Sequence, residues 1–258
     1  IPFKKKSTGK IWSKLKKKKI YLTKPNKNLP VSFHQNKKNE LCIIGNPILN
    51  GIIDNKETAN NFFLNHKDQE WLKEINGEFV FIFSPANNNY LKIINSRFAS
   101  PQVFYRKTKK NFLLSFSFID IANYLKKNNE FLINQEAFFD FLKYQRVFGN
   151  YTYEKFTKVL NPSTILEFDD KKLRKTKYWS PNFKKKLNIS LDEAGDLLLD
   201  KVSNSIKYKL SDKKKPGLFL SGGMDTRLLL ASLKKHIVNF STVTINHKKN
   251  REVKIAEL

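Results

Sequence analysis

Apolar positions along the chain predict strands in the first two thirds and a helix-rich final third. Short apolar runs predict strands at 41–44, 76–83, 90–94 and 112–118, and residues 159–168 and 175–179 predict a further strand and connector. The turn at 85–89 predicts a hairpin between two of them, and with the run 112–118 we expect a β-meander. Helical spacing predicts helices at 60–71 and 134–144, the second with Ala137, Phe138, Phe141 and Leu142 on one side.

The clearest helix spans residues 191–210. Its apolar residues recur every four positions, at Ala194, Leu198, Val202, Ile206 and Leu210. Ser190 and Glu193 have the spacing of a capping box at its start. The polar segment 211–217 ends this helix, and we expect a second domain to begin near residue 188.

A strand, a glycine turn and a helix then follow in direct succession. Residues 218–220 predict a strand buried on both faces of a parallel sheet, and the apolar helix after 224 is expected to pack inside. Gly222 and Gly223 between them tolerate positive φ and lack a Cβ, so the backbone can turn sharply and approach a ligand. The first N–H groups of the helix carry a partial positive charge. This corner is therefore expected to bind phosphate.

Residues 221–226, Ser-Gly-Gly-Met-Asp-Thr, lack the lysine of a Walker A loop. They resemble the S-G-G-x-D-[ST] pyrophosphate loop of the ATP pyrophosphatases, which include asparagine synthetase, GMP synthetase and several tRNA-modifying enzymes. The alternative is a plain glycine turn with Asp225 in a favourable first helical turn.

The resemblance implies ATP and Mg²⁺ as cofactors. The two hydroxyls of the loop and three backbone N–H groups would hold the pyrophosphate, and Asp225 would face the metal. The end of the next apolar strand, at 240–245, would line the adenine pocket. The residues implied at the nucleotide are Leu220, Ser221, Gly222, Gly223, Met224, Asp225, Thr226 and Ile245.

Residues 40–180 resemble the N-terminal glutaminase domain of class II glutamine amidotransferases, as found in asparagine synthetase. The similar pieces, in order, are Asn76-Gly77-Glu78-Phe79, Arg97-Phe98, Phe104-Tyr105, the run 113–117, Leu160-Asn161-Pro162-Ser163 and Tyr178-Trp179. The resemblance implies an α+β fold followed by an α/β fold. Residues 1–187 would form an N-terminal nucleophile-type αββα antiparallel sandwich, and residues 188–258 the start of a parallel-sheet, Rossmann-like ATP pyrophosphatase domain.

The glutaminase chemistry of that family is not expected here. Its nucleophile is an N-terminal cysteine, where this chain has Ile1, although an incomplete N-terminus would give the same difference. Its aspartate that holds the glutamine amino group aligns with Ser96. Its oxyanion hole uses an Asn-Gly pair, where this chain has Ile44-Gly45. We therefore expect an inactive glutaminase domain retained as a scaffold. Only two strand–helix units precede Leu258, so the second domain is expected to be truncated, with catalytic residues beyond Leu258.

Together the two resemblances imply an asparagine-synthetase-like, AMP-forming ligase. A carboxylate, aspartate or a relative, would attack the α phosphate of Mg-ATP, and an amine or ammonia would then displace AMP from the acyl-adenylate. Arg227 stands where asparagine synthetases have serine, which leaves the product open. Two alternatives remain: a tRNA-modifying ATP pyrophosphatase, and a non-catalytic scaffold that keeps both folds.

The charge of the chain is strongly positive, with 49 Lys and Arg against 23 Asp and Glu and a net charge of +26. Arginine, which nucleic-acid surfaces favour, occurs only at 97, 106, 146, 174, 227 and 251. The lysines are scattered among abundant Asn, Ile and Phe, which indicates a compositional bias. We therefore expect small-molecule partners and no nucleic acid.

Cysteine content and the lengths of apolar runs predict the cellular location of the protein. One cysteine excludes internal disulfides. No apolar run approaches the roughly 20 residues of a membrane span, and residues 1–19 contain no apolar signal-peptide core. We expect a cytoplasmic protein with no membrane partner, and the sequence is compatible with a homodimer.

Overall fold

The chain forms two compact units. The computed structural model describes residues 4–5, 10–15, 18–23, 29–37, 39–85, 90–108, 111–169, 172–184, 186–212, 214–236, 239–246 and 253–255. The first unit contains residues 1–47 and 55–181, and the second contains residues 48–54 and 182–258. The assignment of 48–54 to the second unit was not foreseen from the sequence, which suggested a single boundary near 188.

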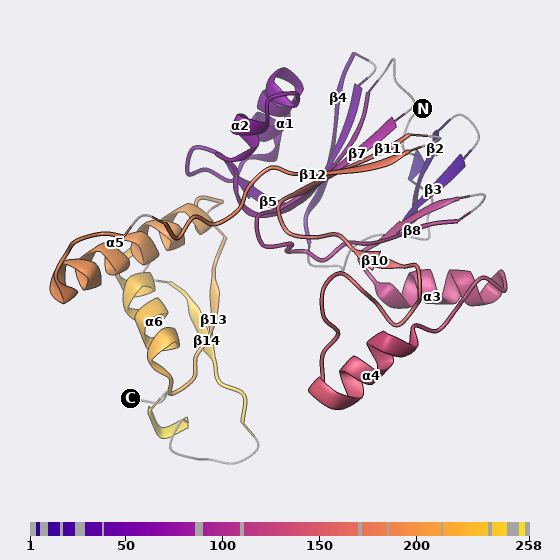
Figure 1. Ribbon diagram of the computed structural model, residues 1–258. Helices are drawn as coiled ribbons and strands as arrows, with labels where there is room; N and C mark the ends of the chain where they lie inside the picture. Colours follow the sequence, from indigo (N-terminus) through magenta and orange to yellow (C-terminus); the bar gives the residue numbers. More distant parts are fainter. Residues whose placement is uncertain are drawn as a thin grey trace. The chain divides into compact units, whose positions relative to one another are not determined.

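Within the described residues, two six-stranded sheets make up most of the first unit (Figure 1). The first sheet has the order β1 Lys4–Lys5, β2 Lys10–Leu15, β3 Lys18–Thr23, β9 Phe112–Ser115, β8 Phe104–Lys107 and β10 Lys158–Val159. The second has the order β12 Leu173–Lys177, β11 Thr164–Asp169, β7 Tyr90–Asn95, β6 Asn76–Ser84, β5 Asn39–Ile48 and β4 Val31–Asn36. Neighbouring strands of the first sheet are antiparallel except for the parallel pair β3 and β9.

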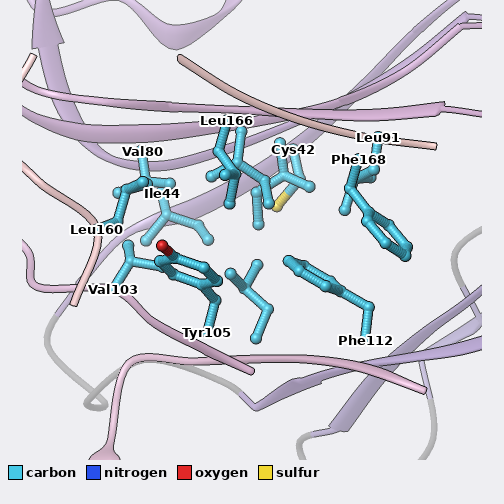
Figure 2. Close-up of a cluster of buried hydrophobic side chains, with 13 residues drawn as sticks. Cys42, Ile44, Val80, Leu91, Val103, Tyr105, Phe112, Leu160, Leu166 and Phe168 are labelled. Atoms are coloured by element: carbon cyan, nitrogen blue, oxygen red, sulfur yellow. The ribbon is translucent and has the colours of Figure 1, made fainter. Parts of the chain in front are cut away.

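The core of the first unit lies between these sheets. Side chains from β5, β6, β7 and β11 face side chains from β8 and β9, as Figure 2 shows for Cys42, Ile44 and Leu166 opposite Tyr105 and Phe112. The rings of Phe112 and Phe168 stack across the interface with centroids 4.3 Å apart. Burial raises the pKa of the Cys42 thiol to about 12, so this lone cysteine is a core residue rather than a nucleophile.

Helices cover the outer faces of both sheets. Phe62 of α1 (Asn55–Asn65) packs on the second sheet with its ring 5.3 Å from that of Phe81, and it also contacts Trp71 of α2 (Gln69–Leu72). Residues Ile121 and Leu125 of α3 (Phe118–Lys127) pack against Leu113 of β9. The expected mixture of helices and antiparallel sheets is confirmed, and the N-terminal nucleophile-type assignment stays a prediction.

Two predicted elements differ in the structure. The run 112–118 is not the third strand of a meander, because β9 ends at Ser115 and pairs with β3 and β8 in the other sheet. The chain leaves the second sheet after β7 and forms β8, which the pattern did not indicate. The helix expected at 60–71 is divided into α1 and α2, because the Asp68 carboxylate accepts a hydrogen bond from Glu70 N and starts a new helix.

The second unit contains two long helices and a small parallel sheet. Its elements are α5 Leu191–Lys209, β13 Gly217–Phe219, α6 Met224–His236 and β14 Ser241–Val243. The predicted capping box is confirmed: Ser190 Oγ accepts from Glu193 N at 3.2 Å, and the Glu193 carboxylate accepts from Ser190 N at 2.8 Å. The hydrogen bonds that the Glu193 carboxylate accepts from Ser190 N and Ser190 Oγ lower the pKa of Glu193. None of the described helices is long and apolar enough to cross a membrane.

Strand β13 is not buried on both faces as the sequence suggested. Phe219 is 71% exposed, and α6 fully buries only Ser232 and Leu233. Among the described residues the sheet has two strands, β13 and β14, which pair in parallel. A strand with one neighbour and one covering helix has an uncovered face, so its apolar side chains meet solvent. A Rossmann-like fold stays a prediction.

His66 makes the stability of the first unit depend on pH. Its ring stacks on Phe62 with centroids 5.7 Å apart, and burial together with the charge of Lys92 lowers its pKa. Below the ordinary pKa of 6.5 the unfolded chain therefore binds a proton that the native state resists, and the free energy of unfolding decreases as the pH falls. Above that pH His66 is neutral in both the native and the unfolded state, so it no longer changes the free energy of unfolding.

The His66→Phe variant keeps the ring and removes the titration. We expect its urea midpoint to change less than that of the wild type between about pH 7.5 and 5.5. Tryptophan fluorescence reports this transition, since Trp12, Trp71 and Trp179 all belong to the first unit. Leu64→Ala, at an exposed position of the same helix, leaves His66 in place and should keep the wild-type dependence of the midpoint on pH. An unchanged dependence in His66→Phe would assign the effect to other groups.

Candidate nucleotide-binding site

The predicted phosphate loop lies between β13 and α6, at the carboxyl edge of the small parallel sheet (Figure 1). Leu220 is buried and donates its N–H to Val243 O at 2.9 Å. The Thr244 hydroxyl donates to Leu220 O at 2.8 Å. Both contacts hold the start of the loop against the end of β14. The predicted order of strand, glycine turn and helix is therefore confirmed.

The hydroxyl of Thr226 closes the loop. It accepts from Ser221 N at 3.2 Å and lies 2.9 Å from Ser221 O, to which it donates. The Ser221 hydroxyl lies 3.1 Å from it and accepts from Gly223 N at 3.3 Å. The resemblance implied that both hydroxyls donate to phosphate. In the structure they are partners of each other and of the loop backbone, so they set its shape.

Of the two properties expected of the loop glycines, positive φ and a missing Cβ, the structure uses the second. The described glycines with positive φ are Gly45, Gly51, Gly77 and Gly149. Gly222 and Gly223 therefore do not use the conformation that glycine alone adopts easily. A Cβ on Gly223 would lie 3.3 Å from Ser221 Oγ, closer than side chains normally approach. The missing Cβ thus makes room for the hydrogen-bonded turn.

The loop offers groups that fit a phosphate. Met224 and Asp225 are exposed at the first turn of α6, where backbone N–H groups have no carbonyl partner within the helix. Among the described residues, no three His, Cys, Asp or Glu side chains lie together as a metal site. Asp225 would therefore hold Mg²⁺ only together with water and phosphate oxygens, which is the usual environment of this ion.

Ile245, implied at the adenine, follows β14 on the same edge of the sheet as the loop. Its side chain is 79% exposed. The structure therefore brings Ile245 to the correct edge and gives it no apolar cover within the described residues. Thr244, which anchors the loop, was not foreseen; the only signal was its place directly after an apolar strand.

The positions that correspond to the glutaminase oxyanion hole are both occupied by structural contacts. The Ile44 side chain is buried in the core between the two sheets (Figure 2). Gly45 has a φ of +94° and donates its N–H to Pro30 O at 2.8 Å. This pair therefore presents no side-chain donor, and the N–H of Gly45 is already paired.

The other residues that carry the amidotransferase resemblance meet in the first unit. Arg97 Nη1 donates to Asn76 Oδ1 at 2.8 Å, and its guanidinium lies 5.2 Å from the ring centroid of Trp179. Ser163 Oγ donates to Arg97 O at 3.1 Å, and Tyr178 N donates to Ser163 O at 2.9 Å. Burial raises the pKa of Tyr178 to about 12. This network joins four separate sequence segments and has a structural role.

Comparison with known proteins adds no assignment. Among protein-family models and curated proteins, none matches this chain. The functional interpretation therefore rests on the loop and on the residues quoted above.

Replacing Thr226 with valine should loosen the loop, because valine has nearly the shape of threonine but lacks the hydroxyl. The variant removes the acceptor of Ser221 N and leaves a partly buried backbone group without a partner, at a cost of about 1–3 kcal/mol. We expect faster hydrogen exchange at the Ser221 amide. Thr242→Val, on the exposed part of β14, is the matched control and should leave that amide unchanged. Equal protection in both variants would contradict the closing role of Thr226.

Proposed function

We propose that this protein is an asparagine-synthetase-like ATP-dependent ligase that activates a carboxylate and converts it to an amide, with release of AMP and pyrophosphate. The observation that carries the proposal is the Ser221–Thr226 loop. A hydrogen-bonded S-G-G-x-D-T turn joins a parallel strand to the exposed N-terminus of α6. That geometry is suited to a polyanionic leaving group such as pyrophosphate.

The proposed reaction has two displacements. Bound Mg-ATP supplies an α phosphate that is open to attack. A carboxylate oxygen forms a bond to this phosphorus as the bond to pyrophosphate breaks. An amine nitrogen then bonds to the carboxyl carbon, AMP leaves, and the amine loses a proton.

The chain's own residues contribute to the first displacement. The N–H groups at the start of α6 would stabilise the negative charge that develops on a pyrophosphate held at this helix end. Asp225, exposed in the same first turn of α6, would hold a hydrated Mg²⁺ that accompanies the phosphates. Ser221 and Thr226 keep the turn in this shape before the nucleotide arrives, so little reorganisation is needed on binding.

The decisive experiment incubates the full-length protein with Mg-ATP, ammonia and a panel of carboxylates that includes aspartate. We expect AMP and pyrophosphate in equal amounts with one of these acids, and no stimulation by glutamine. Asp225→Asn should lower the rate by about 100-fold, the size found for loss of one electrostatic contact in a transition state. Asp192→Asn, in the first turn of α5, is the control with the same change of charge.

Other products would exclude the proposal. Release of ADP and phosphate would show that ATP is cleaved between its β and γ phosphates and not between its α and β phosphates. AMP release that requires tRNA and no small carboxylate would favour a tRNA-modifying enzyme. Failure of the full-length protein to bind Mg-ATP would favour a scaffold.

A further inference from the structure

Residues 143–158, between the end of α4 (Gln135–Tyr144) and β10, form a surface that the proposed ligase function does not use. We call it the basic-aromatic segment. Its basic residues are Lys143, Arg146, Lys155 and Lys158. Its exposed aromatic residues are Tyr144, Phe148, Tyr151, Tyr153 and Phe156.

The only carboxylate in the segment is turned inward. Glu154 is fully buried, and its Oε2 accepts from Phe156 N at 3.1 Å and from both Thr157 N and Thr157 Oγ1 at 2.6 Å. Arg106 Nε of β8 lies 3.4 Å from the same oxygen. This acid therefore compensates buried groups, and the segment presents positive charge to solvent. Glu136 of α4 is the other acidic side chain that acts on Lys158.

Each of the four basic residues lies over an aromatic ring of the segment. The distances to the ring centroids are 4.0 Å for Lys158 over Tyr151, 5.1 Å for Lys143 over Tyr144, 5.5 Å for Arg146 over Phe148 and 5.8 Å for Lys155 over Phe156. None of these four cations has an ion-pair partner within the described part of the chain.

Hydrogen bonds, several of them buried, hold the backbone of the segment in place. Buried Asn134 donates its side-chain amide to Thr152 O at 3.0 Å and its backbone N–H to Tyr153 O at 2.9 Å. Thr152 Oγ1 lies 3.0 Å from Thr157 O, and Val159 N donates to Asn150 O at 2.9 Å. The aromatic side chains are therefore exposed on a fixed backbone, which reduces the entropy lost when a partner binds.

A further cation comes from a strand of the other sheet. Lys175 of β12 lies 5.2 Å from the ring centroid of Tyr105. Burial, and then the charge of Lys175, lower the pKa of Lys158. An anion that approached both ammonium groups would remove this repulsion.

We propose that the basic-aromatic segment binds single-stranded nucleic acid, with bases stacked on the exposed rings and phosphates contacting the lysine and arginine side chains. Alternating aromatic and basic side chains are typical of such surfaces, because unpaired bases present a flat face that duplex bases do not. The net charge of +26 favours the same partner. The proposal reverses our expectation from composition, which does not show that these rings and cations are exposed along one segment, and it is independent of the ligase function.

The test measures binding of the full chain to a labelled single-stranded oligothymidylate of about twelve nucleotides by fluorescence anisotropy. The double variant Phe148→Ala, Tyr151→Ala should bind at least about tenfold more weakly. Phe183→Ala, which removes an 86% exposed ring from the second unit, should not change the affinity. Far-ultraviolet circular dichroism of each variant verifies that the chain remains folded.

A second pair of variants tests the phosphate contacts. Lys155→Gln, Lys158→Gln should reduce the slope of log affinity against log salt by about 1.4, since each phosphate contact to a single strand contributes about 0.7. Lys234→Gln, Lys235→Gln at the end of α6 removes the same charge and should keep the slope.

Three results would overturn the proposal. In the first, the oligonucleotide fails to bind or the control variants lose as much affinity as the segment variants. In the second, heparin or a duplex of the same length binds equally well and the aromatic variants have no effect, which would leave charge alone as the cause. In the third, the chain self-associates without nucleic acid and Phe148→Ala, Tyr151→Ala abolishes this, which would assign the surface to a second copy.

Discussion

Replacing Gly45 with alanine is expected to destabilise the first unit by about 3 kcal/mol or more. Gly45 has a φ of +94°, and a Cβ at this position would lie 2.1 Å from the backbone carbonyl oxygen of Glu78 in the neighbouring strand β6. The obstacle is backbone rather than a flexible side chain, so β5 and β6 would have to separate. Both strands contribute to the core between the sheets. We expect a clearly lower denaturant midpoint by tryptophan fluorescence.

The same substitution at Gly195 is the matched control. Gly195 lies inside helix α5, and a Cβ there would meet no atom within 4 Å. Alanine in a helix interior is favoured over glycine by about 0.5–1 kcal/mol, so Gly195→Ala should stabilise the second unit slightly. Since all three tryptophans belong to the first unit, its fluorescence transition should not change. Equal midpoints for Gly45→Ala and Gly195→Ala would contradict the close approach of β5 and β6.

The second large effect is expected at Phe62. This side chain is fully buried, and its ring lies within 6.0 Å of the rings of Trp71, Phe81 and Phe83. Phe62→Ala would leave a cavity between α1 and the second sheet, at a cost of about 3–5 kcal/mol. Because Trp71 faces this cavity, its fluorescence should report both the loss of stability and a change of environment in the native state.

Leu64→Ala, two residues later on α1, separates burial from helix formation. Leu64 is 80% exposed, so we expect a change within about 0.5 kcal/mol. If both variants lost the same stability, the helix itself and not its buried ring would be responsible.

Local patterns were sufficient for most elements of the fold. The capping box of Ser190 and Glu193 predicted the start of α5 correctly, because its hydrogen bonds join residues three positions apart. The strand at 76–83 and its hairpin partner at 90–94 were predicted from apolar runs and one turn. The parallel pairing of β9 with β3 was not predictable in this way. Strand β3 lies some ninety residues earlier, and no local pattern specifies so distant a neighbour.

The candidate site shows the same division. Residues 221–226 could be placed between a strand and a helix from the sequence alone, because the turn and the helix start are local. Whether β13 is buried depends on other strands and layers, and that expectation was wrong for Phe219. The role of Thr226 was also missed, since the sequence motif gives residue types and not which hydroxyl bonds to which backbone atom. The basic-aromatic segment depends on Glu154 pointing inward, which composition does not reveal.

Residues 48–54 also determine the order in which the protein can be completed during synthesis. This short stretch belongs to the second unit, in which Ile53 N donates to Ser211 Oγ and Gly51 lies beside the ring of Tyr208. The ribosome makes it more than a hundred residues before those partners, a delay on the order of ten seconds. During that interval the first unit can fold around the unpaired stretch, whereas the second unit cannot close until the chain has passed residue 211. A separately expressed piece that starts at residue 182 would never acquire these contacts.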